Sequence, residues 1–423
     1  MEYGLIGKKL GHSWSREIHA LIRDHPYELR EVAPEELRDF FAARDFRGIN
    51  VTIPYKTDII PLLDVISPAA ERIGAVNTVV NRGGKLYGYN TDCDGLKSLI
   101  MRVTGGRGLS GKVLVAGTGG TSKTAEAAAA ELGAGVTVKL SRTGKDGAAT
   151  YAEAAELHRD ASFIINTTPA GMFPDDEGMA TDPALFPALR GAADAVYHPL
   201  RTRFVMRAEE LGLPARGGLY MLVSQAVAAC ALFFGKEADG GLTESVFAKI
   251  AESKENIVLT GMPGSGKTSV GKEIARLTGR KFIDTDDEIV KTDGRPIPRI
   301  FAESGEEFFR DAESAVIARI SANENGAVIA TGGGAVLRRE NVRRLKSGGK
   351  IYLLDRPLKM LLPTEDRPLA RSAADVAVLR EKRMPVYLET ADERTESVRG
   401  PRSVAEEILG SRAKELAEGM KRL

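Results

Sequence analysis

Two glycine-rich loops, each directly after an apolar run, carry the residues of this sequence best suited to chemistry. The run IVLT at 257–260 leads into GMPGSGKT, which matches the spacing G-x-x-x-x-G-K-[ST]. Far upstream, KVLVA at 112–116 leads into GTGGTSKT. Such loops let backbone amides approach phosphate groups at the start of a helix. The sequence therefore predicts two separate nucleotide sites.

The downstream loop predicts an ATP site. Its backbone amides would surround phosphates, Lys267 would reach the β- and γ-phosphate oxygens, and Thr268 would ligate Mg²⁺. The residues expected to bind ATP are Gly261, Gly264, Ser265, Gly266, Lys267 and Thr268.

The upstream loop suits the pyrophosphate of a dinucleotide, bound by Gly117, Gly119 and Gly120 at a helix N-terminus. Ser122 replaces the third glycine of G-x-G-x-x-G, so a βα turn without a ligand is the alternative. The next strand ends in hydroxyls and cations that favour the 2′-phosphate of NADP: Ser141, Arg142, Thr143 and Lys145. Asp146 could instead bind a ribose hydroxyl, which keeps NAD as an alternative.

Further polar side chains stand beside apolar strands in the first 100 residues: Ser13, Ser15, Asn50, Thr52, Lys56, Asn77, Asn90 and Asp92. Singly, each has a simple structural explanation. Ser15 is expected to cap the helix at Arg16–Ile22, and Lys56 with Asp92 could be a surface ion pair. His12 is expected to be structural.

The last 170 residues carry acids and arginines but no histidine, so a general base there must be a carboxylate or water. Asp284 and Asp286, two apart at a predicted strand end, are expected on one side of a sheet. Arg310 and Glu313 have helical i, i+3 spacing. Gly332, Gly333 and Gly334 follow a strand, where their backbone could touch a ligand.

The elements that must position these residues alternate between strands and helices, which predicts an α/β fold. Strands are expected at Lys112–Gly117, Gly135–Ser141, Ser162–Pro169 and Ala193–Pro199, and helices at Tyr220–Phe234 and Leu242–Ala251. A short polar linker at Glu252–Asn256 is expected to separate two halves.

Composition and charge narrow the class of protein. A chain of 423 residues suggests roughly three domains. The formal net charge of +1 favours neither nucleic acid nor an anionic membrane as partner. Two cysteines, Cys93 and Cys230, form no disulfide framework, the N-terminus lacks a signal-peptide pattern, and no apolar run could span a membrane. We therefore expect a cytoplasmic protein.

Residues 1–250 resemble the shikimate dehydrogenases through GxNVTxPxK, GAVNTV, GYNTDxxG, the GxGG loop, NTTPAGM and YMLVSQA. The resemblance implies NADPH-dependent reduction of 3-dehydroshikimate to shikimate, with Lys56 and Asp92 as the catalytic pair. It implies that Ser13, Ser15, Thr52, Asn77 and Gln225 bind the substrate, and that Tyr197 lies near its carboxylate or the nicotinamide. Arg16 departs from the family, in which a proline commonly follows the second serine.

Residues 256–410 resemble the shikimate kinases through the ATP loop, D-x-D, GExxFRxxE, GGG, RPL and RxxxY. By this resemblance Asp284 holds Mg²⁺ through water, and Asp286 binds the shikimate hydroxyls and accepts a proton. Arg310, fixed by Glu313, and Arg383 clamp the carboxylate beside Gly332–Gly334. Lys267 and Arg367, the latter in a lid, act on the phosphates.

The two resemblances together predict a bifunctional enzyme with small-molecule substrates. The predicted domains are a substrate-binding domain at 1–100 completed by 220–251, a Rossmann NADP domain at 101–219, the linker, and a P-loop kinase domain at 257–423. The alternatives are a quinate dehydrogenase that uses NAD, and a nucleotide-sensing P-loop module without transfer activity. Comparing shikimate with quinate as substrates tests the quinate dehydrogenase alternative. The sequence does not predict the oligomeric state.

Overall fold

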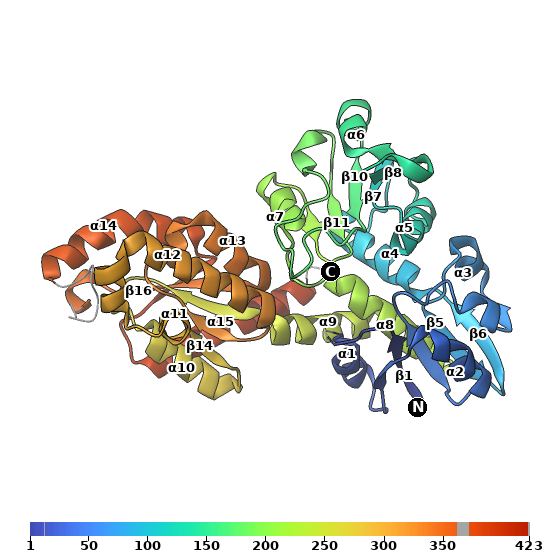
Figure 1. Ribbon diagram of the computed structural model, residues 1–423, viewed down its shortest axis with the longest axis horizontal. Helices are drawn as coiled ribbons and strands as arrows, with labels where there is room; N and C mark the ends of the chain where they lie inside the picture. Colours follow the sequence, from blue (N-terminus) through green and yellow to red (C-terminus); the bar gives the residue numbers. More distant parts are fainter. Residues whose placement is uncertain (12, 362–371, 422–423) are drawn as a thin grey trace. The chain divides into compact units, whose positions relative to one another are not determined.

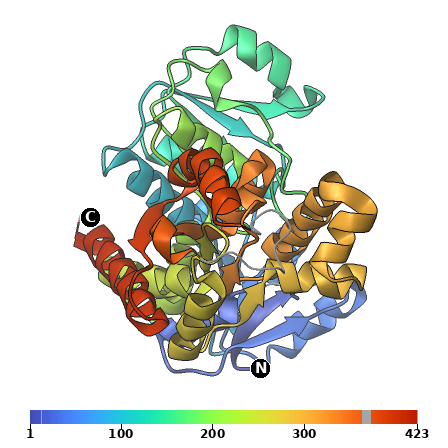
Figure 2. The ribbon, with the colours of Figure 1, turned by 90° about the vertical axis from the view of Figure 1, so that its left-hand side faces the viewer.

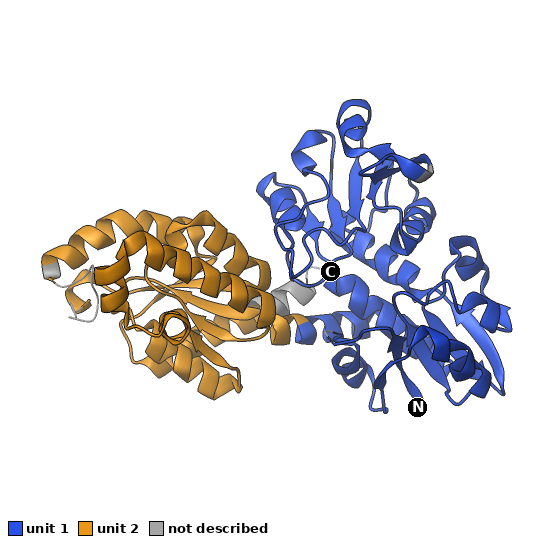
Figure 3. Ribbon diagram, in the orientation of Figure 1, with its two compact units in different colours: residues 1–250 blue, residues 251–423 orange. Residues whose placement is uncertain are grey.

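The computed structural model describes residues 1–11, 13–361 and 372–421, and it divides the chain into two compact units. Unit 1 is Met1–Ile250 and unit 2 is Ala251–Leu423 (Figure 3). Unit 1 contains two six-stranded sheets and unit 2 a five-stranded sheet, with helices against each. The predicted α/β class is confirmed.

The first sheet of unit 1 is mixed. It has the strand order β2-β1-β3-β5-β6-β4, and β5 runs antiparallel to β3 and β6. The strands are β1 (Tyr3–Gly7), β2 (Glu28–Glu31), β3 (Gly48–Val51), β4 (Val65–Ile66), β5 (Thr78–Arg82) and β6 (Lys85–Tyr89). The helices among them are α1 (Ser15–Ile22), α2 (Leu37–Ala43) and α3 (Pro68–Ile73). Every residue of β1 and β3 is buried, so these central strands have apolar cover on both faces.

The second sheet is wholly parallel, in the order β12-β11-β10-β7-β8-β9. Its strands are β7 (Lys112–Ala116), β8 (Val136–Ser141), β9 (Ala149–Thr150), β10 (Phe163–Asn166), β11 (Ala192–Asp194) and β12 (Ala215–Arg216). The helices are α5 (Gly120–Glu131), α6 (Tyr151–Leu157) and α7 (Arg203–Glu210). Val113 and Val115 enter one hydrophobic core and Leu114 the other, as strand alternation requires.

Two helices, α4 (Thr91–Thr104) and α8 (Leu219–Phe234), connect the two sheets of unit 1 and pack along each other (Figure 1). Gly95 allows this contact, because a Cβ there would lie 2.6 Å from the carbonyl oxygen of Met221. Further along α8, Ala229 and Phe233 pack against β1 of the first sheet. Helices α4 and α8 therefore hold the two sheets of unit 1 in a fixed position relative to each other.

Unit 2 has a parallel sheet in the order β14-β15-β13-β16-β17, with helices on both faces. Its strands are β13 (Asn256–Thr260), β14 (Phe282–Asp284), β15 (Val328–Ala330), β16 (Gly349–Asp355) and β17 (Glu393–Glu396). The helices are α10 (Lys267–Thr278), α11 (Thr285–Asp293), α12 (Ile297–Asn323), α13 (Arg339–Gly348), α14 (Ala373–Thr390) and α15 (Pro401–Lys421). Val258 packs with α12 and α13, whereas Ile257 and Leu259 pack with α10 and α15, so these helices cover opposite faces (Figure 2).

The expected linker at 252–256 is not a loop. Glu252–Lys254 form the end of α9 (Gly240–Lys254), and Asn256 begins β13. The polar composition that suggested a linker has another cause: Glu255 forms an ion pair with Arg412 at 2.5 Å, and Arg280 donates to the carbonyls of Glu252 and Glu255. The strand expected at Ala193–Pro199 is also shorter, because β11 ends at Asp194. Within the described ranges, no helix has the length and apolarity to cross a bilayer.

Asp194 fixes the turn that follows β11. Its carboxylate accepts hydrogen bonds from Asn166 Nδ2 (2.9 Å), the Val196 amide (2.9 Å) and Thr202 Oγ1 (2.6 Å). Burial nevertheless raises the pKa of Asp194 to about 7, against the effect of these donors. The native state thus holds a proton on Asp194 at pH values where the unfolded chain has lost it.

The first prediction is that the free energy of unfolding of unit 1 falls as pH rises from about 5 to about 8. The fall should be about 2 kcal/mol larger in the wild type than in Asp194→Asn. Below the unfolded pKa both states are protonated, and between the two pKa values only the native state is. The change should level off above pH 7. Denaturation followed by fluorescence of Trp14, the chain's single tryptophan, measures it. Parallel pH profiles for the two proteins would contradict the prediction.

Candidate active sites

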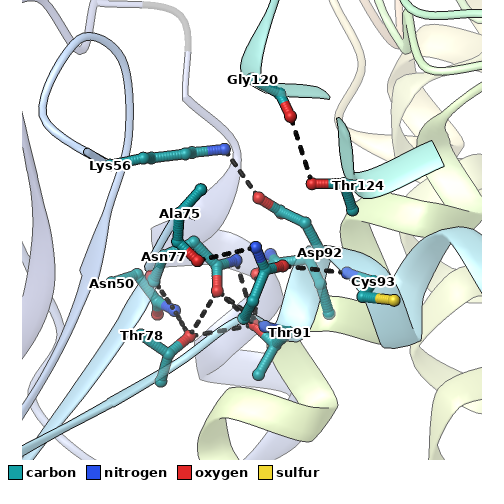
Figure 4. A network of polar contacts seen from close by, with 12 residues as sticks. Asn50, Lys56, Ala75, Asn77, Thr78, Thr91, Asp92, Cys93, Gly120 and Thr124 are labelled. Carbon is teal, nitrogen blue, oxygen red and sulfur yellow. Dashed lines mark hydrogen bonds and ion pairs between the residues drawn. The ribbon is translucent and has the colours of Figure 1, made fainter. Parts of the chain in front are cut away.

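A buried network of polar side chains fixes the start of α4 against the first sheet (Figure 4). Asn77 Oδ1 accepts from the Thr91 amide at 2.7 Å, and Asn77 Nδ2 donates to Thr91 Oγ1 at 3.1 Å. Asn50 Nδ2 donates to Thr78 Oγ1 at 3.0 Å. Asn90 caps the helix by accepting from the Cys93 amide. Asp92 is thereby held in the first turn of α4.

Lys56 and Asp92 meet at the end of this network. Lys56 Nζ lies 2.7 Å from Asp92 Oδ2, and the two side chains are 26% and 15% exposed (Figure 4). Lys56 follows β3, and its carbonyl accepts from the Val76 amide. An ammonium held beside a carboxylate and still open to a cavity can donate a proton.

A cavity of about 410 Å³ collects the residues predicted for the first substrate. Its lining includes Ser13, Ser15, Thr52, Lys56, Asn77, Asp92, Tyr197 and Gln225. Lys9, Asn50, Thr121 and Met221 line it too, although no role was predicted for them. Lys9 lies two residues after the end of β1, and this position near a strand end is the signal that could have identified it.

Ser13 and Ser15 reach the cavity in a different way than expected. Ser15 is the first residue of α1 rather than its N-cap, a position taken by Trp14 without a side-chain bond. The Ser13 hydroxyl accepts from the Ser15 amide at 3.3 Å and donates to Ser15 Oγ at 3.0 Å. Because Ser15 does not cap the helix, its side chain can line the cavity. His12 lies outside the described residues.

Tyr197, in the segment after β11, and Gln225, on α8, also line the cavity. The Tyr197 ring packs against Trp14 with centroids 5.2 Å apart, and burial raises its pKa, so the phenol keeps its proton as a hydrogen-bond donor. Gln225 Oε1 accepts from Thr91 Oγ1 at 3.4 Å, and its Nε2 donates to the carbonyl of Leu222.

The upstream glycine loop lies between β7 and α5. Gly117 has φ +117°, and a Cβ there would lie 2.6 Å from Thr167 Oγ1. Gly119 and Gly120 begin α5 with open space around them. Ser122, in place of the third glycine, is buried and donates to the Gly119 carbonyl at 2.7 Å, so it stabilises the loop. The arrangement leaves the helix N-terminus accessible to an anion.

The residues predicted to select NADP stand at the end of β8, next in the sheet to β7. Ser141 Oγ accepts from the Gly144 amide at 2.9 Å and shapes the turn. Arg142, Thr143 and Lys145 are exposed. The Gly117 amide donates to Leu140, so the cations border the glycine loop.

In unit 2 a cavity of about 360 Å³ extends from the ATP loop to the predicted acids and arginines. It is lined by Gly264, Gly266, Lys267, Thr268, Asp284, Asp286, Arg310, Gly332, Gly333, Gly334 and Arg383. Gly261 and Ser265 do not line it. Gly261, at φ +142°, has no room for a Cβ because the Leu354 carbonyl would lie 2.6 Å away, and Ser265 is buried. Arg367 lies outside the described residues.

Thr268 and Asp284 form an oxygen pair at the mouth of the ATP loop. Thr268 Oγ1 donates to Asp284 Oδ2 at 2.8 Å, and two such oxygens fit the ligand preference of Mg²⁺. The spacing of Asp284 and Asp286 suggested that both belong to a strand, but Asp286 lies outside it. Asp284 ends β14 and caps α11 by accepting from the Asp286 amide at 3.0 Å, which places Asp286 in the first turn of the helix.

The buried carboxylate of Glu313 orients the Arg310 side chain. Its Nη1 lies 2.7 Å from Glu313 Oε2, with the side chains 9% and 0% exposed. Burial raises the pKa of Glu313, and the charge of Arg310 opposes that shift. Gly334 makes room for the guanidinium, because a Cβ there would lie 2.1 Å from Arg310 Nη1.

Arg383 and Tyr387, one helical turn apart on α14, both bond to the carbonyl of Gly333, Arg383 at 3.0 Å. The role of Tyr387 in holding this loop was not predicted, nor was that of Arg356, which donates to the Gly264 carbonyl at 3.3 Å. Arg356 directly follows β16, a strand-end position that could have indicated it. Three guanidinium groups, those of Arg310, Arg356 and Arg383, thus line one cavity with Lys267.

Known proteins resemble each unit separately. Residues 5–79 match the family model of the shikimate dehydrogenase substrate binding domain. A shikimate dehydrogenase (NADP(+)) of Clostridium perfringens is 35% identical over 267 residues, which are 59% of this chain and 97% of that protein. A Thermus thermophilus shikimate 5-dehydrogenase, solved with NADP(H) and shikimate, is 32% identical with a TM-score of 0.52, over 59% of this chain and 99% of that one.

Residues 263–412 match the shikimate kinase family model. A shikimate kinase from Acinetobacter baumannii, solved with shikimate, is 35% identical over 40% of this chain and 98% of that one, with a TM-score of 0.38. The chain therefore belongs to the shikimate dehydrogenase family, and its second unit carries a domain that matches the shikimate kinase model.

Proposed function

We propose that this chain reduces 3-dehydroshikimate to shikimate with NADPH in unit 1 and phosphorylates shikimate with ATP in unit 2. The observation that carries the first half is the 410 Å³ cavity in which Lys56 and Asp92 meet six further polar residues predicted to bind substrate. The second half is supported by two arginines and an aspartate gathered beside Lys267. The first product is the second substrate, so the two reactions follow one another.

In unit 1, NADPH supplies the hydride. As negative charge develops on the ketone oxygen, Lys56 Nζ donates a proton to it, and Asp92 keeps the ammonium oriented. The hydroxyls of Ser13 and Ser15 and the Tyr197 phenol bind the carboxylate. Hydrogen-bond donors fixed before the reaction stabilise the transition state without having to reorganise.

In unit 2, the guanidinium groups of Arg310 and Arg383 bind the shikimate carboxylate, a pairing that suits the planar fork of arginine. Asp286 accepts the proton of the attacking hydroxyl, and Lys267 stabilises the transferred phosphoryl group. Thr268 and Asp284 would hold Mg²⁺, which neutralises charge on the phosphates. A nucleotide-sensing module has no need of this carboxylate clamp.

The deciding experiment supplies the purified chain with 3-dehydroshikimate, NADPH and MgATP. We expect shikimate 3-phosphate, with one ADP and one NADP⁺ formed for each product. ADP formation should depend on shikimate, and quinate or NADH should substitute poorly. Accumulation of unphosphorylated shikimate, or ADP release independent of shikimate, would leave the kinase half without support.

A second prediction concerns Lys56. Lys56→Met should lower kcat of the reduction at least ~100-fold and change KM little, because the ammonium acts in the transition state. Lys97→Met is the matched control, since Lys97 lies on α4 and pairs with Glu131 outside the cavity. Steady-state kinetics of both variants measure the difference. A near-normal kcat in Lys56→Met would remove Lys56 from the mechanism.

A third prediction concerns the carboxylate clamp. Arg310→Lys should raise KM for shikimate about 100-fold, because lysine keeps the charge but loses the two-pronged contact, while KM for ATP stays nearly unchanged. Arg338→Lys is the control. Arg338 pairs with Glu307 and Asp311 of α12 but does not line the cavity. Equal effects of the two substitutions would mean that Arg310 only supports the fold.

A further inference from the structure

Three side chains that could hold a metal ion gather on unit 1, and none of them lines the cavity of that unit. They are His19 of α1, His25 in the segment before β2, and Cys230 of α8, and their donor atoms lie within 4.8 Å of one another. None belongs to the motifs that predict dehydrogenase or kinase chemistry. Two nitrogens and a sulfur are a donor set for zinc-type cations and not for Mg²⁺ or Ca²⁺.

The hydrogen bond of His25 fixes which of its nitrogens is free. Nδ1 lies 2.9 Å from the carbonyl oxygen of Arg23, and a carbonyl can only accept, so Nδ1 carries the hydrogen. Nε2 therefore has the lone pair. It is buried and has no hydrogen-bond partner among the described residues. Metal-bound histidines commonly donate their second nitrogen to a backbone carbonyl in this way.

His19 is fully buried, and neither ring nitrogen makes a hydrogen bond of standard geometry within the described part of the chain, although the Asn50 side chain lies near the ring. Leaving a buried polar atom unsatisfied costs about 1–3 kcal/mol, and such atoms are rare in native proteins. Cys230 is a free cysteine with 5% exposure. The cluster thus contains three buried ring nitrogens without a standard hydrogen bond, next to a buried thiol that forms no disulfide.

Aromatic rings enclose the cluster. Tyr27 stacks on His19 with centroids 3.8 Å apart, while Tyr3 and Phe234 each meet His25 edge to face at 5.4 Å. An apolar shell of this kind limits water and holds the imidazoles in place. Tyr27 also donates to Asn50 Oδ1 at 2.8 Å, and Asn50 lines the cavity of unit 1.

We propose that His19, His25 and Cys230 bind one zinc-type divalent cation that stabilises unit 1. A tetrahedral ion brings its ligand atoms to about 3.5 Å from one another, a small contraction from the present spacing. The ion ties α1 to α8 at one turn from Ser15 and little more than one turn from Gln225, which both line the cavity. It takes no part in hydride transfer.

The test uses the full-length chain, freed of metal with chelator and kept without nucleotide. Co²⁺ is added first, because its charge-transfer absorption reports a thiolate ligand and therefore ignores oxygen ligands at Thr268 and Asp284. Cys230→Ala is compared with Cys93→Ala, which removes the other buried free cysteine. His25→Gln is a milder second variant, since His25 is only half-buried.

We expect one Co²⁺ per chain with a thiolate band in the wild type and in Cys93→Ala, and no band in Cys230→Ala. Addition of Zn²⁺ should abolish the band and raise the melting temperature, followed by Trp14 fluorescence, by roughly 5 °C in the first two proteins. His25→Gln should lose the Zn²⁺-dependent rise while melting cooperatively. The absence of a band in the wild type, or the same rise in every variant, would overturn the proposal.

Discussion

The close approach of α4 to α8 at Gly95 is the constraint on which the first active site depends. A side chain at this position would collide with the Met221 carbonyl and with Gln225, so the two helices could no longer pack along each other. Helix α4 carries Asp92, and α8 carries Gln225, while both connect the two sheets of unit 1. A contact between two backbones therefore sets the distance between the substrate-binding residues and the nucleotide loop. The polar network of Asn77 and Thr91 fixes the end of α4, and the ion pair of Lys56 with Asp92 forms on that support.

In both units, charged side chains in partly buried sites are each paired with a carboxylate or a backbone carbonyl. Burial of an isolated charge is costly, but an arginine beside a carboxylate keeps its charge and still has donors left over. Glu313 takes one edge of Arg310, and Gly333 takes one donor of Arg383, so each guanidinium is oriented before a ligand arrives. In unit 1, Asp92 does the same for Lys56. Orientation of this kind lowers the entropy lost when the substrate carboxylate or ketone binds.

The sequence predicted the fold class and the site residues best where a motif has a spacing that its chemistry requires. The α/β class, the dehydrogenase family and the shikimate kinase domain are confirmed, and many of the residues chosen from motifs line the two cavities, although their roles stay predictions. Local spacing misled in three places. Asp284 and Asp286 fit a strand, yet the chain enters α11 between them, because Asp284 caps that helix. Ser15 looked like a cap, but the helix begins at Ser15 itself and Trp14 occupies the N-cap position. The polar stretch at 252–256 looked like a linker because ion pairs with distant residues such as Arg412 leave no local pattern. Tyr387 stood in the RxxxY motif, but its long-range bond to the Gly333 carbonyl could not be predicted from that spacing.

The space beside Gly334 has a consequence for how this protein can change over generations. The guanidinium of Arg310 occupies the volume that any side chain at position 334 would need. A side chain there is accommodated only if the Arg310 guanidinium moves or position 310 becomes smaller, and either change would disturb its contact with Glu313 and with a ligand. Positions 310 and 334 therefore constrain each other, although each residue alone has an ordinary structural role.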